Sequence, residues 1–215
     1  MIKAAIFDLD GTLADTLPDI LTAINGICEL RSIPTVDEAF VLKFINGDTE
    51  EFVRSSVPGI PESEIPEWVE QYKQIYAKCY LDKTHEYAGM TGVLRALRER
   101  GVKLAVFSNK ADEAVKNLAK KLFPGLFDFA LGAGIYKSKP NAEGALAILD
   151  SFGVKPCEAV FIGDSDVDVN TAKNAGIRAI GVSWGYRGHA FLEALGGCDV
   201  VDTMDELLKN ILENN

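Results

Sequence analysis

The stretch Ala4-Ala5-Ile6-Phe7-Asp8-Leu9-Asp10-Gly11-Thr12 joins a short apolar run to a polar turn near the start of the 215-residue chain. Four consecutive apolar residues predict a strand that is buried on both faces, which is typical of parallel sheets. The carboxylates of Asp8 and Asp10 follow this strand directly. Open α/β sheets bind their ligands at the carboxyl ends of their strands, so we expect the functional site there.

Further apolar runs along the chain also end abruptly in polar residues. They are 103–107 before Ser108, 159–162 before Gly163 and 178–182 before Ser183, with 128–131 and 199–202 as weaker candidates. Apolar stripes at helical spacing separate these runs from about residue 89 onward. The alternation of strand and helix predicts a doubly wound α/β fold with a mainly parallel, Rossmann-like sheet.

Residues 16–87 interrupt the alternation with helical patterns only. Apolar stripes run from Leu17 to Cys28 and from Ile65 to Cys79, and Thr35-x-x-Glu38 predicts a capping box between them. Because the insert begins directly after the polar end of the first strand, we expect an all-helical cap domain that covers that end. The predicted division is a core of residues 1–15 and 88–215 and a cap of residues 16–87.

The composition excludes several classes of protein and of partner. The chain has 22 Lys and Arg against 32 Asp and Glu, a formal net charge of −10 that argues against nucleic acid and membrane partners. The two histidines disfavour a His-rich zinc site and a Ser-His-Asp triad. The four cysteines show no CxxC spacing, so free, buried thiols are expected. No run approaches the roughly 20 apolar residues of a membrane span, so we expect a cytoplasmic protein and leave its oligomeric state open.

Charged and polar residues collect at the predicted strand ends. They are Asp8, Asp10, Ser108, Asn109, Lys110, Lys137, Lys139, Asp164, Asp166 and Asp168. So many carboxylates at one edge of a sheet need positively charged partners, because unpaired buried charges are very costly. Aspartate oxygens are suitable ligands for Mg²⁺, which prefers oxygen ligation.

This set of residues resembles the haloacid dehalogenase superfamily in its phosphatase branch. The matching motifs are Asp8-x-Asp10-Gly11-Thr12, Ser108 in Phe107-Ser108-Asn109-Lys110, Lys139-Pro140 and Gly163-Asp164-x-x-x-Asp168. Their order and strand context agree with the family over nearly the whole chain. The resemblance therefore implies a phosphoester hydrolase with Mg²⁺ as its cofactor.

The resemblance also implies a chemical role for individual residues. Asp8 would attack phosphorus and form an aspartyl-phosphate, and Asp10 would act first as general acid and then as general base. Ser108 and the backbone amide of Asn109 would hold the phosphoryl oxygens, and Lys139 would balance the negative charge. A second possibility for Ser108 is that it caps the next helix.

The same resemblance implies a metal site and a phosphate-binding turn. Asp8, the backbone carbonyl of Asp10, Asp164 and Asp168 would hold Mg²⁺, with Asp168 supporting its waters. Gly11 would allow the sharp turn after the first strand, and together with Thr12 it is predicted to bind substrate. Two residues close to these motifs, Lys137 and Asp166, are not assigned to the site. Lys137 is a weaker candidate than Lys139 for the third motif, and Asp166 is more simply a solvent-facing acid in the first turn of a helix.

The position of the insert resembles the small helical cap of the phosphoglycolate-phosphatase-like subgroup. Segment 43–48, with Lys43 and Gly47, is the candidate for substrate recognition in the cap, although a plain helix junction explains Gly47 equally well. Whether Lys43, Arg54, Arg187 or His189 contacts substrate stays open. The four aromatic residues at steps of four, Trp68, Tyr72, Tyr76 and Tyr80, are interpreted as the core of the cap.

The sequence as a whole predicts a Mg²⁺-dependent phosphomonoester hydrolase for a small soluble phosphate ester. By resemblance, 2-phosphoglycolate is the first choice of substrate. A pyrophosphatase, a nucleotidase and a sugar-phosphate mutase are alternatives within the superfamily, and a non-catalytic binding module is an alternative outside catalysis. The mutases carry His and then Trp-Lys on the first cap helix, where this chain has Ile20, Ile24 and Asn25.

Overall fold

The computed structural model describes residues 1–45, 47–57 and 59–213 and divides into two compact units. One unit, called the core unit here, consists of Met1–Ala14 and Glu86–Asn215. The other, called the helical unit, is the inserted segment Asp15–His85. The chain passes between the units through two short strands, β2 (Ala14–Asp15) and β3 (His85–Glu86), which pair with each other.

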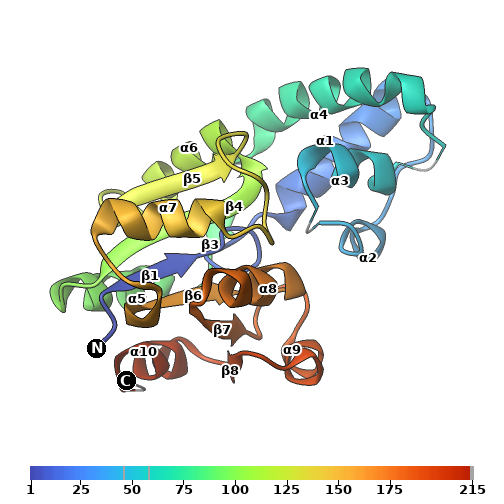
Figure 1. Cartoon of the computed structure of the whole chain (residues 1–215). Coiled ribbons are helices and arrows are strands. Elements are labelled where there is room, and N and C mark those ends of the chain that lie inside the picture. Colours follow the sequence, from blue (N-terminus) through green and yellow to red (C-terminus); the bar gives the residue numbers. More distant parts are fainter. Residues whose placement is uncertain (46, 58, 214–215) are drawn as a thin grey trace. The chain divides into compact units, whose positions relative to one another are not determined.

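A six-stranded sheet forms the centre of the core unit, in the order β5-β4-β1-β6-β7-β8 (Figure 1). Its strands are β1 (Ala4–Phe7), β4 (Lys103–Ala111), β5 (Phe129–Ala133), β6 (Ala159–Gly163), β7 (Arg178–Val182) and β8 (Asp199–Val201). Each described pair in this sheet is parallel. Phe7 lies beside Val106 and Ile162. The polar residues that follow these positions in the chain therefore lie at the same edge of the sheet. The predicted doubly wound α/β fold is confirmed.

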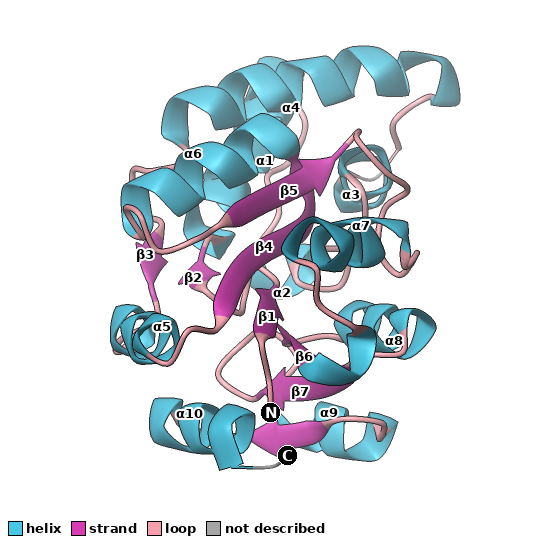
Figure 2. Cartoon of the chain, turned by 60° about the vertical axis from the view of Figure 1, so that its left-hand side comes forward, coloured by secondary structure: helices cyan, strands magenta, loops and turns pink. Residues whose placement is uncertain are grey.

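Helices cover both faces of this sheet (Figure 2). They are α5 (Met90–Glu99), α6 (Asp112–Leu122), α7 (Glu143–Phe152), α8 (Asp166–Ala175), α9 (His189–Leu195) and α10 (Met204–Glu213), with a 3-10 turn at Pro156–Glu158. Crossover helices are required because parallel neighbours cannot be joined by a tight hairpin. Each crossover therefore returns the chain to the edge where the strands begin. The loops that form the site lie at the opposite edge, where the strands end.

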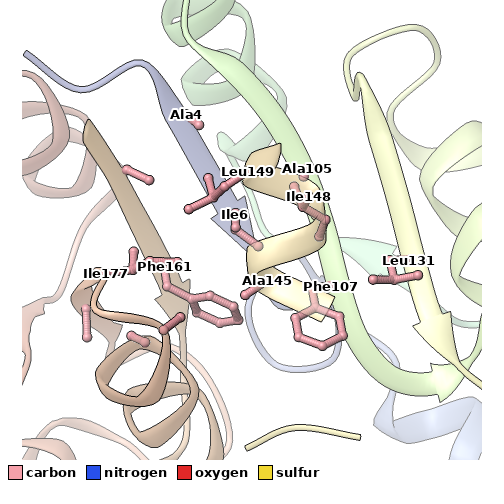
Figure 3. Close-up of a cluster of buried hydrophobic side chains, with 14 of the residues drawn as sticks. Ala4, Ile6, Ala105, Phe107, Leu131, Ala145, Ile148, Leu149, Phe161 and Ile177 are labelled. Atoms are coloured by element: carbon pink, nitrogen blue, oxygen red, sulfur yellow. The ribbon is translucent and has the colours of Figure 1, made fainter. Parts of the chain in front are cut away.

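Alternation along the central strands explains how one core face is built. Successive side chains of a strand point to opposite faces, so Ala4 and Ile6 of β1 share a face. They belong to a buried cluster with residues of α7 and α8. Figure 3 shows Ala145, Ile148 and Leu149 of α7 facing this part of the sheet. Burial of each large apolar side chain contributes about 1.5–3 kcal/mol. The cluster thus fixes the strands whose ends form the site.

The helical unit is held by two long helices, α1 (Leu17–Leu30) and α4 (Ile65–Cys79), which pack against each other. Shorter segments complete it, namely α2 (Glu38–Val41), α3 (Thr49–Ser56) and a 3-10 turn at Glu62–Glu64. Trp68, Tyr72 and Tyr76 are buried, and the last two rings stack with centroids 5.7 Å apart. The interpretation as the core of the insert is confirmed for these three residues, whereas Tyr80 is half-buried, with its ring 5.9 Å from that of Tyr76.

Two local predictions are wrong, one in the helical unit and one in the core unit. Thr35 does not begin a helix, because the N-cap of α2 is Asp37, whose carboxylate accepts a hydrogen bond from the Phe40 amide at 2.8 Å. Aspartate is itself a preferred N-cap, and it stands directly before the first helical residue. The four cysteines are free, as predicted, and Cys28 and Cys79 are buried, but Cys157 is exposed and Cys198 is half-buried. Among the described residues, no helix is long and apolar enough to cross a bilayer.

Candidate active site

The turn after β1 brings the first motif to the edge of the sheet. The amide of Asp8 continues the strand by donating to the Ile162 carbonyl at 2.8 Å, and Gly11 then donates to Ala14 at 3.0 Å to close a tight turn. Gly11 has φ +79°, a conformation that side chains rarely adopt. A Cβ at this position would lie 2.5 Å from Oδ2 of Asp164 and 2.9 Å from the Tyr186 ring. Glycine is therefore needed in this turn for two reasons, the positive φ of the backbone and the lack of space for a side chain.

Replacing Gly11 with Ala is expected to lower kcat/KM for a phosphate ester by at least about 100-fold, because a displacement of about 1 Å in a site has this effect. The added methyl group would push the Asp164 carboxylate and the Tyr186 ring out of place. Steady-state phosphate release measures the effect. Gly92→Ala is the control, because a Cβ there meets nothing within 4 Å. Parent-like activity in Gly11→Ala would contradict this description of the turn.

Three buried carboxylates form the centre of the site. Asp8, Asp164 and Asp168 are 8%, 1% and 2% exposed, and one oxygen of each lies within 4.8 Å of the others. Burial and, next, the charge of Asp168 raise the pKa of Asp8 from 3.8 to about 7, although Lys139 acts in the opposite direction. Burial and the charges of Asp168 and Asp8 also raise the pKa of Asp164 well above its ordinary value. The cluster therefore holds more negative charge than its neighbours balance, which favours a bound cation.

Lys139 bridges two members of this cluster. Its Nζ lies 2.8 Å from Oδ1 of Asp8 and 2.6 Å from Oδ1 of Asp168, and its side chain is 3% exposed. Burial alone would lower the pKa of Lys139, but Asp168 and Asp8 outweigh it and raise that pKa above the ordinary lysine value. Lys137, the other candidate, is exposed and lies 3.4 Å from Glu143. Of the two lysines, only Lys139 is brought into the carboxylate cluster.

The side chain of Asn109 fixes the loop that carries Lys139. Asn109 Oδ1 accepts from the Lys139 amide at 2.7 Å, and Asn109 Nδ2 donates to the Lys139 carbonyl at 3.0 Å. The ammonium then lies over the rings of Phe107 and Phe161, 6.0 and 5.7 Å from their centroids. Cation–π contacts of this kind are favourable for a desolvated ammonium. The sequence pattern predicted a role for the backbone of Asn109 but did not reveal this use of its amide.

A second cluster of polar side chains lies at the end of β4. The Lys110 ammonium is 2.7 Å from Oδ1 of Asp10, and the Ser108 hydroxyl is 3.5 Å from Oδ2 of the same carboxylate. Ser108 Oγ also accepts from the Lys110 amide at 3.1 Å. Helix α6 begins later, at Asp112, so the interpretation of Ser108 as its cap is wrong. Lys110 had been assigned no role from the sequence.

The fourth motif is held by the start of α8. Asp168 is the third residue of this helix, and its Oδ2 accepts from the Ser165 amide at 3.1 Å and from the Ser165 hydroxyl at 2.6 Å. The bond from the Ser165 amide is the one that an N3 carboxylate makes in a capping box, and both bonds leave Oδ1 for Lys139. Asp166 lies in the same first turn, half-buried and outside the group of three carboxylates. Its interpretation as a first-turn acid agrees with this position.

The loop after β7 packs against the first motif. The Tyr186 amide donates to Oδ2 of Asp164 at 2.7 Å, and the Trp184 indole donates to the Thr12 carbonyl at 3.1 Å. Thr12 is buried, with its hydroxyl 3.5 Å from Oδ1 of Asp164. A Cβ at Gly185 would overlap the side chain of Asp164. This loop therefore orients one of the carboxylates, a function that the sequence did not indicate.

The remaining candidates have partners away from the carboxylates. The Arg187 guanidinium lies 5.5 Å from the Phe191 ring centroid, and His189 is bonded to Asp202 at 2.7 Å. That hydrogen bond raises the pKa of His189 above its ordinary value.

In the helical unit, Arg54 is paired with Glu50 and Glu62, each at 2.9 Å. Lys43 is exposed with its ammonium 5.5 Å from the Phe40 ring, and Gly47 donates to the Phe44 carbonyl at 3.4 Å. Asn46, inside the predicted recognition segment, lies outside the described residues. Substrate contact by this segment stays a prediction.

The α/β core with its carboxylates at the strand ends defines a class of hydrolase, and comparison with known proteins identifies the same class. Residues 5–182 match the family model of the haloacid dehalogenase-like hydrolases. The chain belongs to this family. Within it, the chain is a phosphatase of the phosphoglycolate-phosphatase-like kind, as its relatives indicate.

Two curated relatives and one solved structure illustrate the similarity. The phosphoglycolate phosphatase of Chromobacterium violaceum is 32% identical, with 97% of each chain covered. The phosphoglycolate phosphatase of Pseudomonas putida is 31% identical over 96% of this chain and 78% of its own length. A structure from Lactobacillus delbrueckii subsp. bulgaricus, provisionally assigned as a phosphoglycolate phosphatase, has a TM-score of 0.91 at 33% identity and covers 98% of both chains.

Proposed function

We propose that the protein is a Mg²⁺-dependent phosphomonoester hydrolase that acts through an aspartyl-phosphate on Asp8. The single observation that supports this most is the buried group of Asp8, Asp164 and Asp168, with the Lys139 ammonium 2.8 Å from Asp8 and 2.6 Å from Asp168. A cluster of this kind is costly to the fold unless a bound cation balances its negative charge. Its elevated pKa values are typical of functional sites.

The residues of the cluster fit a bound Mg²⁺. Their oxygens lie within 4.8 Å of one another, they are buried, and the raised pKa values of Asp8 and Asp164 signal uncompensated negative charge. Asp8, the carbonyl of Asp10, Asp164 and Asp168 would hold the ion. When bound, it supplies the positive charge that allows an anionic nucleophile to approach an anionic phosphoryl group.

The remaining chemistry follows from the side chains. An oxygen of Asp8 bonds to phosphorus while the bond from phosphorus to the ester oxygen breaks, and Asp10 gives that oxygen a proton. Asp10 then takes a proton from water, whose oxygen attacks the phosphorus, and the bond to Asp8 breaks to release inorganic phosphate. Ser108 and the Asn109 amide would donate hydrogen bonds to the phosphoryl oxygens throughout.

The substrate we propose is a small phosphate ester, with 2-phosphoglycolate as the first choice. Support comes from the relatives that are named phosphoglycolate phosphatases and that match over 96–97% of this chain. We propose that the helical unit acts as the cap, since closing lids exclude water and limit substrate size. The predictions of a cytoplasmic location and of no nucleic acid or membrane partner rest on composition alone.

Phosphate release over a panel of small phosphate compounds tests this proposal. The panel contains 2-phosphoglycolate, a hexose phosphate, a nucleoside monophosphate and pyrophosphate, each with excess MgCl₂ and with EDTA. We expect one ester, first of all 2-phosphoglycolate, to have the highest kcat/KM, and EDTA to abolish turnover until Mg²⁺ is restored. Failure of every compound to release phosphate in the presence of Mg²⁺ would overturn the proposal.

Mg²⁺ is expected to raise the melting temperature more at about pH 8 than at about pH 5.5. The folded pKa of Asp8, about 7, lies above its unfolded value of 3.8, so the metal-free folded state binds more protons between these values. Its stability therefore falls as pH rises through this window, and Mg²⁺ competes with protons for the same carboxylates. Thermal melts in EDTA and in MgCl₂ measure the difference. An increment that does not depend on pH would contradict the assignment of Asp8 to the metal site.

A further inference from the structure

Two ammonium groups with almost no exposure lie at the carboxyl ends of the strands, and they have different partners. Lys139 is shared between Asp8 and Asp168. Lys110, whose side chain is 9% exposed, instead lies 2.7 Å from Oδ1 of Asp10. The chemistry under "Proposed function" uses Lys139 and leaves Lys110 without a role. A lysine so nearly buried needs a reason, because desolvation of an ammonium is costly.

The place of Lys110 follows from its contact with Asp10. Ser108 and Lys110 are two positions apart near the end of β4, where the register with β5 shifts, and both side chains reach the carboxylate of Asp10, at 3.5 and 2.7 Å. Ser108 would hold the phosphoryl group, and Asp10 would contact the leaving oxygen. The Lys110 ammonium is one hydrogen bond away from Asp10. It therefore lies on the leaving-group side of the site.

We propose that Lys110 determines specificity by binding a carboxylate on the leaving group of the substrate. The inference rests on the proposed function, and it specifies the substrate class as 2-phosphorylated carboxylic acids. In such an ester a single carbon separates the leaving oxygen from the carboxylate. A group adjacent to Asp10 is therefore at the right separation to contact it. An ammonium has three N–H donors, so Lys110 can keep Asp10 and bind the substrate carboxylate at the same time.

The charge and burial of Lys110 make this contact selective. Hydrogen bonds between an ammonium and a carboxylate are about twice as strong as bonds between neutral groups. An ester without the carboxylate gains nothing from Lys110, whereas the carboxylate ester gains a charge-assisted bond in a site of low exposure. Sites of this kind discriminate strongly against analogues that lack the recognised group.

The experiment compares two esters that differ at one group, 2-phosphoglycolate and 2-hydroxyethyl phosphate, on the parent, Lys110→Met and Lys110→Arg. We expect Lys110→Met to lower kcat/KM for 2-phosphoglycolate by at least about 30-fold more than for 2-hydroxyethyl phosphate, with the difference mainly in KM, because any fall common to both esters comes from the lost ion pair with Asp10. Lys110→Arg should recover part of the loss for 2-phosphoglycolate. Lys121→Met, at an exposed lysine of α6, is the matched control.

Each outcome separates the inference from the proposed function. An equal fall for both esters would show that Lys110 only positions Asp10 and would overturn the inference. A parent that hydrolyses both esters equally well would also overturn it and would leave the phosphatase function standing. A parent that hydrolyses neither would overturn the inference, and the panel of phosphate compounds under "Proposed function" would then show whether the proposed function fails as well.

A second measurement needs no variant and covers the case in which Lys110→Met does not fold. With 2-hydroxyethyl phosphate as the substrate of the parent, glycolate is expected to inhibit at a concentration at least about 10-fold lower than ethylene glycol does. Equal inhibition by the two alcohols would overturn the inference, because they differ only in the carboxylate that Lys110 is proposed to bind.

Discussion

Replacing Asp8 with Asn is expected to lower phosphate release by at least about 10⁴-fold while the protein remains folded, because removal of a nucleophile has effects of this size or larger. The amide has nearly the same shape as the carboxylate but is a poor nucleophile. The change also removes an ionised group from a site that disfavours it, since burial raises the pKa of Asp8 to about 7. In EDTA at about pH 8, the variant should therefore melt at a higher temperature than the parent.

Asp166→Asn is the matched control for this variant. It alters a carboxylate in the first turn of α8 that is outside the buried group of three. Its activity should remain within about 2-fold of the parent, because Asp166 lies outside the group of three carboxylates and takes no part in the proposed chemistry. The proposed role of Asp8 is wrong if Asp8→Asn and Asp166→Asn release phosphate at similar rates.

Replacing Lys139 with Met is expected to reduce both activity and stability. The change leaves Asp8 and Asp168 without an ammonium that lies 2.8 and 2.6 Å away. Loss of one partner from a buried ion pair costs about 3–5 kcal/mol, so the melting temperature in EDTA should fall by roughly 6–20 °C. Activity with Mg²⁺ should fall at least about 1000-fold, because the charge on the phosphoryl group is no longer balanced.

Lys137→Met tests whether the effect belongs to the ammonium of Lys139 or to the loop. Lys137 lies two residues earlier, with an exposed side chain and only a long ion pair of 3.4 Å to Glu143. Exposed pairs contribute about 0–1 kcal/mol, so we expect parent-like activity and melting temperature. A large loss in Lys137→Met, or none in Lys139→Met, would contradict the assignment of the third motif.

Residues of the site that follow a strand directly were predictable from the sequence. Asp8 and Asp164 come after continuous apolar runs, and parallel strands place their ends at a common edge. The structure brings Asp8, Asp164 and Asp168 together as that reasoning expected. The chemical roles of these residues stay part of the proposed function, since proximity alone does not assign them.

Partnerships between distant side chains were not predictable. The bond from Trp184 to Thr12 joins residues 172 positions apart, and the pair of Lys110 and Asp10 spans 100 positions. No local pattern signals either of them. Lys110 did stand directly beside Ser108 and Asn109 in the second motif, and that position was the available signal. In the loop after β7, the sequence marked Trp184-Gly185-Tyr186 only as similar to the subgroup and Arg187 only as a possible substrate contact, and neither feature pointed to Thr12 or Asp164.

The fold was predictable where a pattern is long enough to repeat. The apolar runs at Ala4–Phe7 and Arg178–Val182 became strands with those bounds. Strands β2 and β3 contain two residues each, too few to show alternation. The error at Thr35 arose because two capping residues, Thr35 and Asp37, precede the same short helix, and the one next to it caps it.

The most direct test of the account is to locate the phosphoryl group on the protein. Asp10→Asn should form the aspartyl-phosphate from p-nitrophenyl phosphate, whose leaving group needs no acid, and should then hydrolyse it slowly for want of a base. After mixing with Mg²⁺ and this ester and quenching in acid, mass spectrometry is expected to find one phosphoryl group on Asp8. A phosphoryl group on another residue, or phosphate release by Asp10→Asn at the parent rate with Asp8 unmodified, would contradict the account.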